Sequence, residues 1–308
     1  MDQQAENLAP DAGISKIGVI GAGEMGGGIA QVLAVAGYKV RLQDISAERV
    51  QNGLMGIKAR LGRLVNKQKM LAAGCAEAIG RISTSTATEP FADCDLVIES
   101  AIEDPRVKCE IFEKVCPVLP EEAIICTNTS SISVTMLASH TDRPDRFMGM
   151  HFMNPVPLMK LVELIRALTT SNETEAAVKG VVAKLGKTAI PSLDYPAFIV
   201  NRILLPMINE AIFALYEGIG NVESIDAAMK LGANLPMGPL ELGDFIGLDI
   251  CLSIMRVLYE GTADSKYRPC PLLVKYVEAG WLGRKSGCGF YNYNTHPPVV
   301  NYRMFRAE

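Results

Sequence analysis

The stretch IGVIGAGEMGGGIA, residues 17–30, decides the fold. Its first four residues have the apolar composition of a buried strand, and residues 29–36 have that of a helix. Between them, Gly21, Gly23 and Gly26 form a GxGxxG turn. The first glycine permits the tight turn, the second lets a pyrophosphate approach the backbone, and the third lets the helix pack on the strand. The helix N-terminus then offers free N–H groups to a phosphate.

A second strand, residues 38–44, ends at Asp44. A carboxylate at this point accepts hydrogen bonds from the ribose hydroxyls of adenosine and repels a 2′-phosphate. The pattern therefore predicts NAD rather than NADP, held by Gly21, Gly23, Glu24, Met25 and Gly26. We expect the negatively charged Glu24 side chain either to point away from the phosphates or to weaken binding. The alternative is a glycine-rich turn that binds no ligand.

Outside this loop, residues 16–192 alternate short apolar runs with amphipathic stretches. This predicts an α/β Rossmann-like domain with a doubly wound, mainly parallel sheet. Further strands are expected at residues 95–100, 123–127, 147–152 and 160–165, and one long basic helical excursion at residues 47–73. After residue 195 the strand signals stop and helical spacing takes over, with Pro206 as a kink. An all-helical second domain is therefore expected over residues 193–308, with helices at residues 200–215, 223–231, 238–260 and 270–280.

The length of the chain allows one large domain or two ordinary ones, and its composition fits a globular protein. The 308 residues are 49% hydrophobic and 21% charged, and the net charge of −4 argues against bulk binding to nucleic acid or to a membrane. No apolar run approaches the roughly 18 residues of a membrane span. Eight cysteines without metal-site spacing indicate free thiols in a reducing, cytoplasmic compartment and no metal site. Residues 1–15 lack a targeting signal and are expected to form a flexible extension.

Three histidines limit the search for a catalytic base. His140 and His296 lie in polar segments, where we expect solvent exposure. His151 ends an apolar strand, and a turn centred on Pro157 would bring Glu163 opposite it. A carboxylate inside an apolar strand needs a partner. A His–Glu pair satisfies both groups, orients the imidazole and stabilises its protonated form. A purely structural His–Glu pair is the alternative.

Polar residues also follow the strand at 123–127, in the segment TNTSS. The carboxyl ends of strands carry ligand groups in doubly wound sheets, so one of Ser130 and Ser131 is expected to face the cleft. The other reading is that either serine caps a helix beginning near Ile132. Asn201, in the first turn of the second domain, is a candidate donor from that domain. Its alternative is a polar residue that merely begins a helix.

Taken together, seven segments resemble the L-3-hydroxyacyl-CoA dehydrogenase family, and most of all its bacterial 3-hydroxybutyryl-CoA dehydrogenase members. They run from Ile17 to about Tyr293 and cover some nine-tenths of the chain. The HFxNPVPxMKLVE segment is far more specific than the glycine loop. The segments are IGVIGAGEMGGGIA, DLVIES, TNTSSIS, RFMGMHFMNPVPLMKLVELI, YPAFIVNRILLPMINEA, GANLPMGPLELGDFIGLD and GWLGRKSGCGFY.

The resemblance implies reversible, NAD-dependent oxidation of a short-chain L-3-hydroxyacyl-CoA to the 3-oxoacyl-CoA. It implies that His151 is the base, that Glu163 orients it, and that Ser130 and Asn201 contact the substrate. It also implies a homodimer formed through the helical domain. The remaining predicted cofactor contacts are Glu103, Lys108, Asn128, Ser130, Asn154 and Lys285. Glu24 in the loop and Ser100 after VIE depart from the family pattern.

The basic excursion offers a site for the phosphates of CoA. Arg60, Arg63 and Lys67 are spaced for one helix face, although a solvated charged face would have the same spacing. Two other functions stay open. One is a Rossmann dehydrogenase acting on a free hydroxy acid or on gulonate. The other is a non-catalytic NAD-binding or structural protein.

Overall fold

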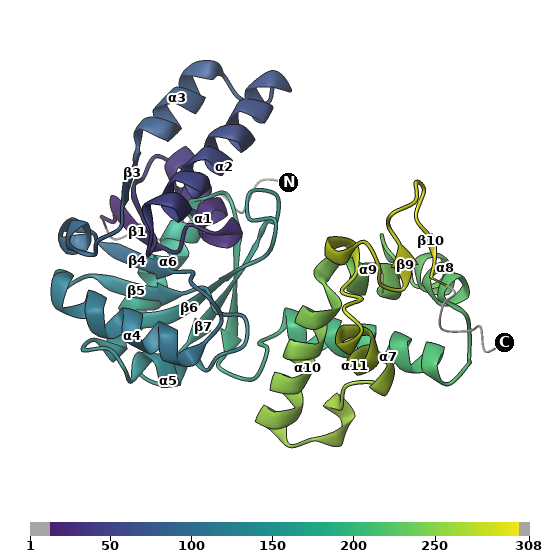
Figure 1. The fold of residues 1–308 in the computed structure, drawn as a ribbon. Helices are drawn as coiled ribbons and strands as arrows, with labels where there is room; N and C mark the ends of the chain where they lie inside the picture. The colour runs from purple at the N-terminus through teal and green to yellow at the C-terminus, as the bar shows by residue number, and fades with distance from the viewer. Residues whose placement is uncertain (1–12, 302–308) are drawn as a thin grey trace, which may run out of the picture. The chain divides into compact units, whose positions relative to one another are not determined.

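The computed structural model describes residues 13–301 (Figure 1). Most of the predicted extension over residues 1–15 lies outside the described residues. The chain forms two compact units, which divide between Phe198 and Ile199. The predicted domain boundary after residue 192 falls inside the last strand of the first unit, β8 (Thr188–Leu193).

The first unit is built on an eight-stranded sheet in the order β3-β2-β1-β4-β5-β6-β7-β8. The first six strands run parallel in the order of a doubly wound fold, which confirms the predicted class. β7 pairs antiparallel with β6 and parallel with β8. The other seven strands are β1 (Lys16–Ile20), β2 (Lys39–Gln43), β3 (Ile82–Ser85), β4 (Leu96–Glu99), β5 (Ile124–Thr127), β6 (Phe147–Phe152) and β7 (Leu161–Arg166).

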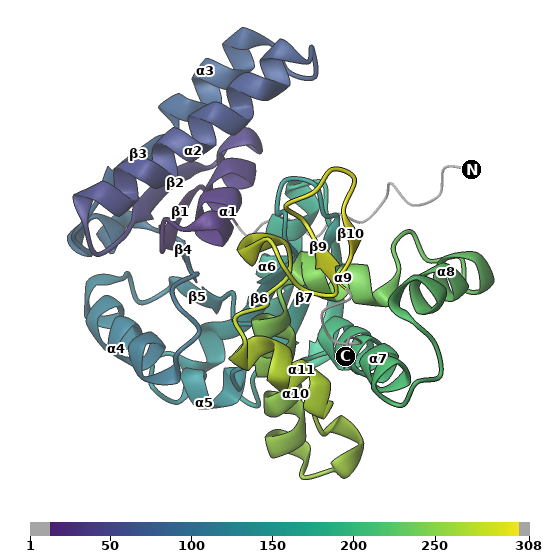
Figure 2. The ribbon, with the colours of Figure 1, turned by 45° about the vertical axis from the view of Figure 1, so that its right-hand side comes forward.

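Helices cover both faces of this sheet (Figure 2). Strand residues alternate between two cores, as a two-sided sheet requires; Leu96 and Ile98 enter one core, and Val97 enters the other. The first core is closed by α1 (Glu24–Val35), α2 (Ala47–Asn66), α3 (Ala72–Gly80) and α6 (Asn172–Lys184). The second is closed by α4 (Pro105–Val115) and α5 (Val134–Ala138).

The predicted helical excursion over residues 47–73 is wrong in one respect, because it consists of two helices. α2 ends at Asn66, and Gln68 takes a left-handed φ of 55° before α3 begins at Ala72. Residues 66–69 are exposed polar residues, so no buried apolar side chain holds them in a helix. Figures 1 and 2 show α2 and α3 side by side.

The second unit is helical, as predicted. Its helices are α7 (Val200–Tyr216), α8 (Val222–Gly232), α9 (Pro239–Ile246), α10 (Leu248–Thr262) and α11 (Pro271–Glu278). The helix expected over residues 238–260 is divided, because Gly247 has a φ of 105°. Two short strands, β9 (Tyr291–Asn292) and β10 (Val299–Val300), form a hairpin that the sequence analysis did not predict. Within residues 13–301, no helix is both long and apolar enough to cross a bilayer.

Short 3₁₀ turns complete the fold: η1 (Glu89–Asp93), η2 (Cys116–Val118), η3 (Pro144–Arg146), η4 (Ser265–Tyr267) and η5 (Arg284–Ser286).

Candidate active site

The glycine loop joins β1 to α1 in a conformation that requires glycine at two positions, Gly21 and Gly26. Gly21 has a φ of 97°, and a Cβ at Gly26 would lie 1.8 Å from the Gly21 carbonyl oxygen. Within residues 13–301, no side chain caps the α1 N-terminus, and a Cβ at Gly23 would meet no heavy atom within 4 Å. The loop therefore leaves helix N–H groups and open space together, which fits a phosphate group.

Asp44 follows β2 and holds this loop. Its Oδ2 accepts the Ala22 N–H at 2.8 Å, and its Oδ1 accepts the Ile45 N–H at 2.7 Å. The Asp44 side chain is 10% exposed, and the Arg49 guanidinium lies 3.9 Å from Oδ1. Ile45, immediately after Asp44, is 80% exposed. The Asp44 carboxylate, which is predicted to bind the ribose, is thus fixed in place at the end of β2.

Glu24 points from the glycine loop toward the segment that follows β6. Its Oε1 accepts a hydrogen bond from the Asn154 amide at 3.3 Å. Close packing joins the same two segments, because a Cβ at Gly28 of α1 would lie 2.9 Å from the Val156 Cβ. Asn154 is therefore tied to the cofactor loop as well as to the strand that carries His151.

His151 and Glu163 face each other across the antiparallel pair β6–β7, in the predicted register. The His151 Nδ1 lies 2.8 Å from the Glu163 Oε2. The Glu163 side chain is fully buried and the His151 side chain is 8% exposed. Because an ionised carboxylate only accepts hydrogen bonds, Nδ1 carries the proton and Nε2 carries the lone pair. The Phe198 ring lies against the imidazole, with 5.7 Å between centroids.

A buried ion pair lies at the carboxyl ends of β4 and β5. The Lys108 Nζ is 2.7 Å from the Glu99 Oε1 and 3.5 Å from the Glu103 Oε2. Glu103 and Lys108 are predicted from the sequence, whereas Glu99 is not. The signal was available, since Glu99 is a carboxylate inside the apolar run DLVIES just as Glu163 is inside KLVELI.

Glu103 organises the loop that follows β5. Its Oε1 accepts hydrogen bonds from the Thr129 hydroxyl at 2.6 Å and from the Ser130 and Ser131 N–H groups at 2.8 and 3.1 Å. Burial alone would raise the pKa of Glu103, but the Lys108 ammonium and these donors outweigh it and hold that pKa below its usual range. The loop is thereby clamped to the loop after β4.

The reading of Ser130 or Ser131 as a helix cap is wrong. Ser133 caps α5 by accepting the Met136 N–H, and it does so because α5 begins at Val134 rather than near Ile132. Asn128 joins three strand ends instead. Its Oδ1 accepts the Phe152 N–H at 2.8 Å, and its amide donates to the Ser100 hydroxyl at 3.3 Å. The departure at Ser100 thus supplies an acceptor that alanine would lack.

The remaining predicted residues differ in whether their side chains are already paired or are exposed. The Arg60 Nε donates to the Gln31 side chain at 2.7 Å, so Arg60 turns toward α1, whereas Arg63 and Lys67 are exposed. Asn201 is half-buried in the first turn of α7 in the second unit, and Lys285 pairs there with Asp249 at 2.5 Å. His140 and His296 are exposed, as predicted.

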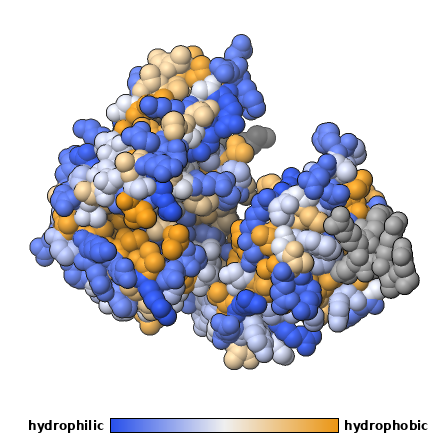
Figure 3. All heavy atoms as spheres, viewed as in Figure 1, coloured by the Kyte–Doolittle hydropathy of each residue, from blue (hydrophilic) through white to orange (hydrophobic). Residues whose placement is uncertain are grey.

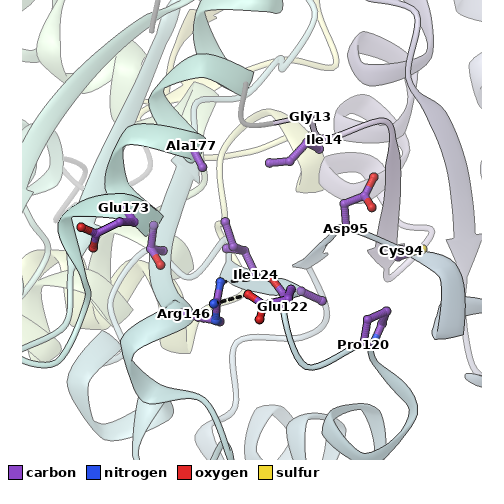
Figure 4. Close-up of a pocket in the computed structure, with 12 residues that line it drawn as sticks. Gly13, Ile14, Cys94, Asp95, Pro120, Glu122, Ile124, Arg146, Glu173 and Ala177 are labelled. Carbon is purple, nitrogen blue, oxygen red and sulfur yellow. Dashed lines mark hydrogen bonds and ion pairs between the residues drawn. The ribbon is translucent and has the colours of Figure 1, made fainter. Parts of the chain in front are cut away.

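A pocket of about 290 Å³ lies at the opposite, amino-terminal edge of the sheet (Figure 4). Its lining includes Asp95 before β4, Ile124 at the start of β5 and Arg146 before β6. Doubly wound folds bind ligands outside the carboxyl ends of their strands. The glycine loop, Asp44, Glu103, Asn128 and His151 all lie at those ends, so we assign the site there.

Two family models match nearly the whole chain: "3-hydroxyacyl-CoA dehydrogenase, NAD binding domain" over residues 16–195 and "3-hydroxyacyl-CoA dehydrogenase, C-terminal domain" over residues 198–293. The chain belongs to the 3-hydroxyacyl-CoA dehydrogenase family. This family consists of NAD-dependent oxidoreductases. The family membership predicted from the sequence motifs is therefore confirmed.

Named members of the 3-hydroxyacyl-CoA dehydrogenase family are similar over their full length. A 3-hydroxybutyryl-CoA dehydrogenase of Bradyrhizobium diazoefficiens is 63% identical over 286 residues, which are 93% of this chain and 98% of that protein. A probable 3-hydroxybutyryl-CoA dehydrogenase of Bacillus subtilis is 53% identical over 91% of this chain and 98% of its own. The crystal structure of the (S)-3-hydroxybutyryl-CoA dehydrogenase of Ralstonia eutropha superposes with a TM-score of 0.90 at 50% identity, covering 92% of this chain and all of that one.

Proposed function

We propose that the protein oxidises short-chain L-3-hydroxyacyl-CoA, with 3-hydroxybutyryl-CoA as its main substrate, and that it catalyses the reverse reduction with the same residues. The observation that carries this proposal is the buried His151–Glu163 pair at the carboxyl end of the sheet, 2.8 Å between Nδ1 and Oε2. The similarity to three 3-hydroxybutyryl-CoA dehydrogenases supports the short acyl chain.

The first unit fits NAD. The uncapped N-terminus of α1 with its open Gly23 suits the pyrophosphate, and the Asp44 carboxylate suits the adenosine ribose. Glu103, Lys108, Asn128, Ser130 and Asn154 lie beyond it toward β6, where the nicotinamide half of a dinucleotide belongs. Asp44 favours NAD over NADP, although Arg49 lies beside it. When bound, NAD supplies the hydride acceptor for the reaction.

His151 is proposed to act as the general base. With Nδ1 held by Glu163, the lone pair of Nε2 is free to take the proton of the C3 hydroxyl group. The buried carboxylate then stabilises the imidazolium, and the protonated ring returns the proton to the C3 oxygen in the reverse direction. Positioned general-base catalysis contributes about 10²- to 10⁴-fold to a rate.

The substrate contacts are also proposals. Ser130 and Asn201 are assigned to the oxygen atoms of the substrate on the strength of the family resemblance. Exposed Arg63 and Lys67 suit the phosphates of CoA, because a guanidinium and an ammonium pair well with phosphate oxygens. Arg60 is the weakest of the three, since its Nε is engaged by Gln31. For Lys285, the pair with Asp249 would have to open before it could contact a cofactor.

The test compares His151→Gln, Glu163→Gln and the exposed control His140→Gln. We expect kcat with 3-hydroxybutyryl-CoA to fall about 10²- to 10⁴-fold in His151→Gln, with NADH affinity unchanged. Glu163→Gln should lose less activity, and His140→Gln none. Wild-type turnover by His151→Gln would disprove the assignment of the base.

A substrate panel separates the proposed function from the two others. Oxidation of free 3-hydroxy acids without oxidation of CoA thioesters would favour a hydroxy-acid dehydrogenase. NADH binding without turnover of any hydroxyacyl-CoA would favour a non-catalytic role. Retention of the His151–Glu163 pair argues against lost catalysis.

We also propose a homodimer formed through the second unit. Large apolar side chains are exposed there, among them Ile203 at 68%, Ile219 at 76% and Leu231 at 87%. Orange patches on this unit are visible in Figure 3. A cytoplasmic location remains part of the proposal, and the eight cysteines, which form no disulfide in the described chain, fit its reducing conditions.

A further inference from the structure

Glu99 is a fully buried carboxylate that the proposed mechanism does not use. The Lys108 ammonium donates to it at 2.7 Å, the Thr127 hydroxyl at 2.6 Å and the Ala101 N–H at 2.6 Å. The ammonium and the N–H group can only donate, whereas the threonine hydroxyl can donate or accept. Both obligate donors converge on Oε1 and the hydroxyl binds Oε2, so Glu99 is placed as the carboxylate partner of the Lys108 ammonium in a buried ion pair.

Lys108 connects Glu99 to Glu103. Its side chain is 1% exposed, while that of Glu103 is 36% exposed. A buried ammonium requires a paired anion, and here it has two. We call Glu99, Lys108 and Glu103 the acid–lysine cluster. Two carboxylates and one ammonium leave it with one net negative charge, and its buried members Glu99 and Lys108 lie where charge is weakly screened.

The acid–lysine cluster lies in the half of the sheet that receives the nicotinamide. The pyrophosphate site is at β1 and the ribose acid Asp44 is on β2, so the adenosine half covers β1 to β3 and the other half covers β4 to β6. Glu99 ends β4, and Thr127, which binds it, ends β5. The nicotinamide ring is positively charged in NAD⁺ and neutral in NADH.

We propose that Glu99 sets the preference of the site for oxidised over reduced cofactor, by giving the acid–lysine cluster its net negative charge and by holding Lys108 between the two carboxylates. Charge near a cofactor is one of the main means by which a protein tunes it. The inference rests on the proposed use of NAD. It concerns the relative binding of the two cofactor forms and does not depend on the role of His151.

The test measures binding rather than turnover. NADH affinity is determined from the change in its fluorescence, and NAD⁺ affinity by competition against NADH. In Glu99→Gln the acid–lysine cluster becomes neutral, and we expect the ratio Kd(NAD⁺)/Kd(NADH) to rise about fivefold. Glu99→Asp keeps the charge and should keep the wild-type ratio, even if both forms bind more weakly.

Thr127→Val is the matched structural control. It removes the hydroxyl that binds the Glu99 Oε2 but leaves every charge in place. It should therefore weaken the binding of NAD⁺ and of NADH by the same factor. If Glu99→Gln also weakens both forms equally, or raises the preference for NAD⁺, the proposal is wrong and Glu99 is only structural.

Two further outcomes are separated by the design. If Glu99→Gln does not fold, Glu103→Gln removes the same unit of charge from a partly exposed position and must raise the ratio in the same direction; an unchanged ratio there overturns the proposal. If the wild-type protein binds neither NADH nor NAD⁺, the proposed function fails, and the charge proposal fails with it.

Discussion

At the scale of the residue, Glu24 places a carboxylate in a loop that fits a diphosphate. It lies in the first turn of α1, where the helix dipole favours its charge, and it bonds the Asn154 amide at 3.3 Å. A bound diphosphate would compete with the Glu24 carboxylate for the positive end of the α1 helix dipole. Glu24 therefore stabilises the free protein more than it stabilises the complex with cofactor.

Glu24→Gln should bind NADH about threefold more tightly, because one repulsion across partly hydrated space is removed while the amide keeps an acceptor for Asn154. The gain should shrink in high salt. A fluorescence titration with NADH at two salt concentrations measures both effects. Glu121→Gln, an exposed acid just before β5 at the other edge of the sheet, serves as the control and should show neither.

The same scale shows what sequence reasoning could find. Glu163 was placed opposite His151 because an acid in an apolar strand needs a partner and the turn length fixes the register. Glu99 met the first condition, but its partner Lys108 comes from the following helix rather than from a facing strand. Nothing in strand register identifies such a partner, so the pair emerged only from the three-dimensional arrangement.

At the scale of the element, glycines in two neighbouring helices, α1 and α2, differ in whether they leave room for a side chain. A Cβ at Gly26 would lie 1.8 Å from the Gly21 carbonyl oxygen, which belongs to the backbone and cannot move away without opening the loop. In α2, by contrast, a Cβ at Gly62 would meet no heavy atom within 4 Å in the described chain.

Gly26→Ala should therefore abolish NADH binding or prevent folding, whereas Gly62→Ala should stabilise the protein by about 0.5–1 kcal/mol through higher helix propensity. Urea unfolding and NADH titration measure the two effects. A Gly26→Ala protein with normal stability and normal NADH affinity would contradict the steric account of the loop. Gly62→Ala should leave NADH affinity unchanged.

The two strands of the large sheet that sequence patterns missed, β3 and β8, are its edge strands, where burial is low. β3 has the sequence ISTS with no fully buried residue, so it carries no apolar alternation to detect. β8 contains Pro191 and lies at the sheet edge, where proline is tolerated and burial is low. Most strands predicted correctly are central ones, such as β4, β5 and β6, whose residues are all buried.

At the scale of the whole molecule, the homodimer proposal places its interface on the second unit. Ile219→Glu combined with Leu231→Glu should shift the protein toward monomer, because two charges would be buried in an apolar contact. Light scattering coupled to gel filtration measures the mass. Leu168→Glu alters a residue that is 91% exposed in the first unit and should leave the mass unchanged. A wild-type monomer would refute the proposal.

Two acids, one in each unit, have their pKa values shifted in opposite directions, that of Asp93 by ion pairing and that of Asp244 by burial. In the first unit, the Arg41 guanidinium and Lys16 hold the pKa of Asp93 well below its usual range. In the second unit, burial raises the pKa of Asp244 from 3.8 to about 6, although the Tyr291 and Phe290 N–H groups and the Tyr293 hydroxyl donate to it. The stability that the ion pairs of Asp93 give the fold is lost as the pH falls through the low folded pKa of Asp93. The stability that comes from protonated Asp244 is lost as the pH rises through its folded pKa of about 6.

The sign follows from proton binding. Between pH 4 and pH 6 the folded second unit holds a proton on Asp244 that the unfolded chain has released, so raising the pH through this range favours unfolding. Stability should thus be about 1 kcal/mol greater at pH 5 than at pH 7 from this group. The single tryptophan, Trp281, lies in the second unit against Tyr276, and its fluorescence reports urea unfolding there.

We expect the urea midpoint followed by Trp281 to rise from pH 7 to pH 5, at one fixed protein concentration, and to lose most of this rise in Asp244→Asn. The matched control is Asp264→Asn, in the same unit. The pKa of Asp264 is lowered, chiefly by the Lys266 N–H, so its own contribution lies below this pH range and the rise should persist. An equal rise in both variants would show that the buried Asp244 carboxyl is not its source.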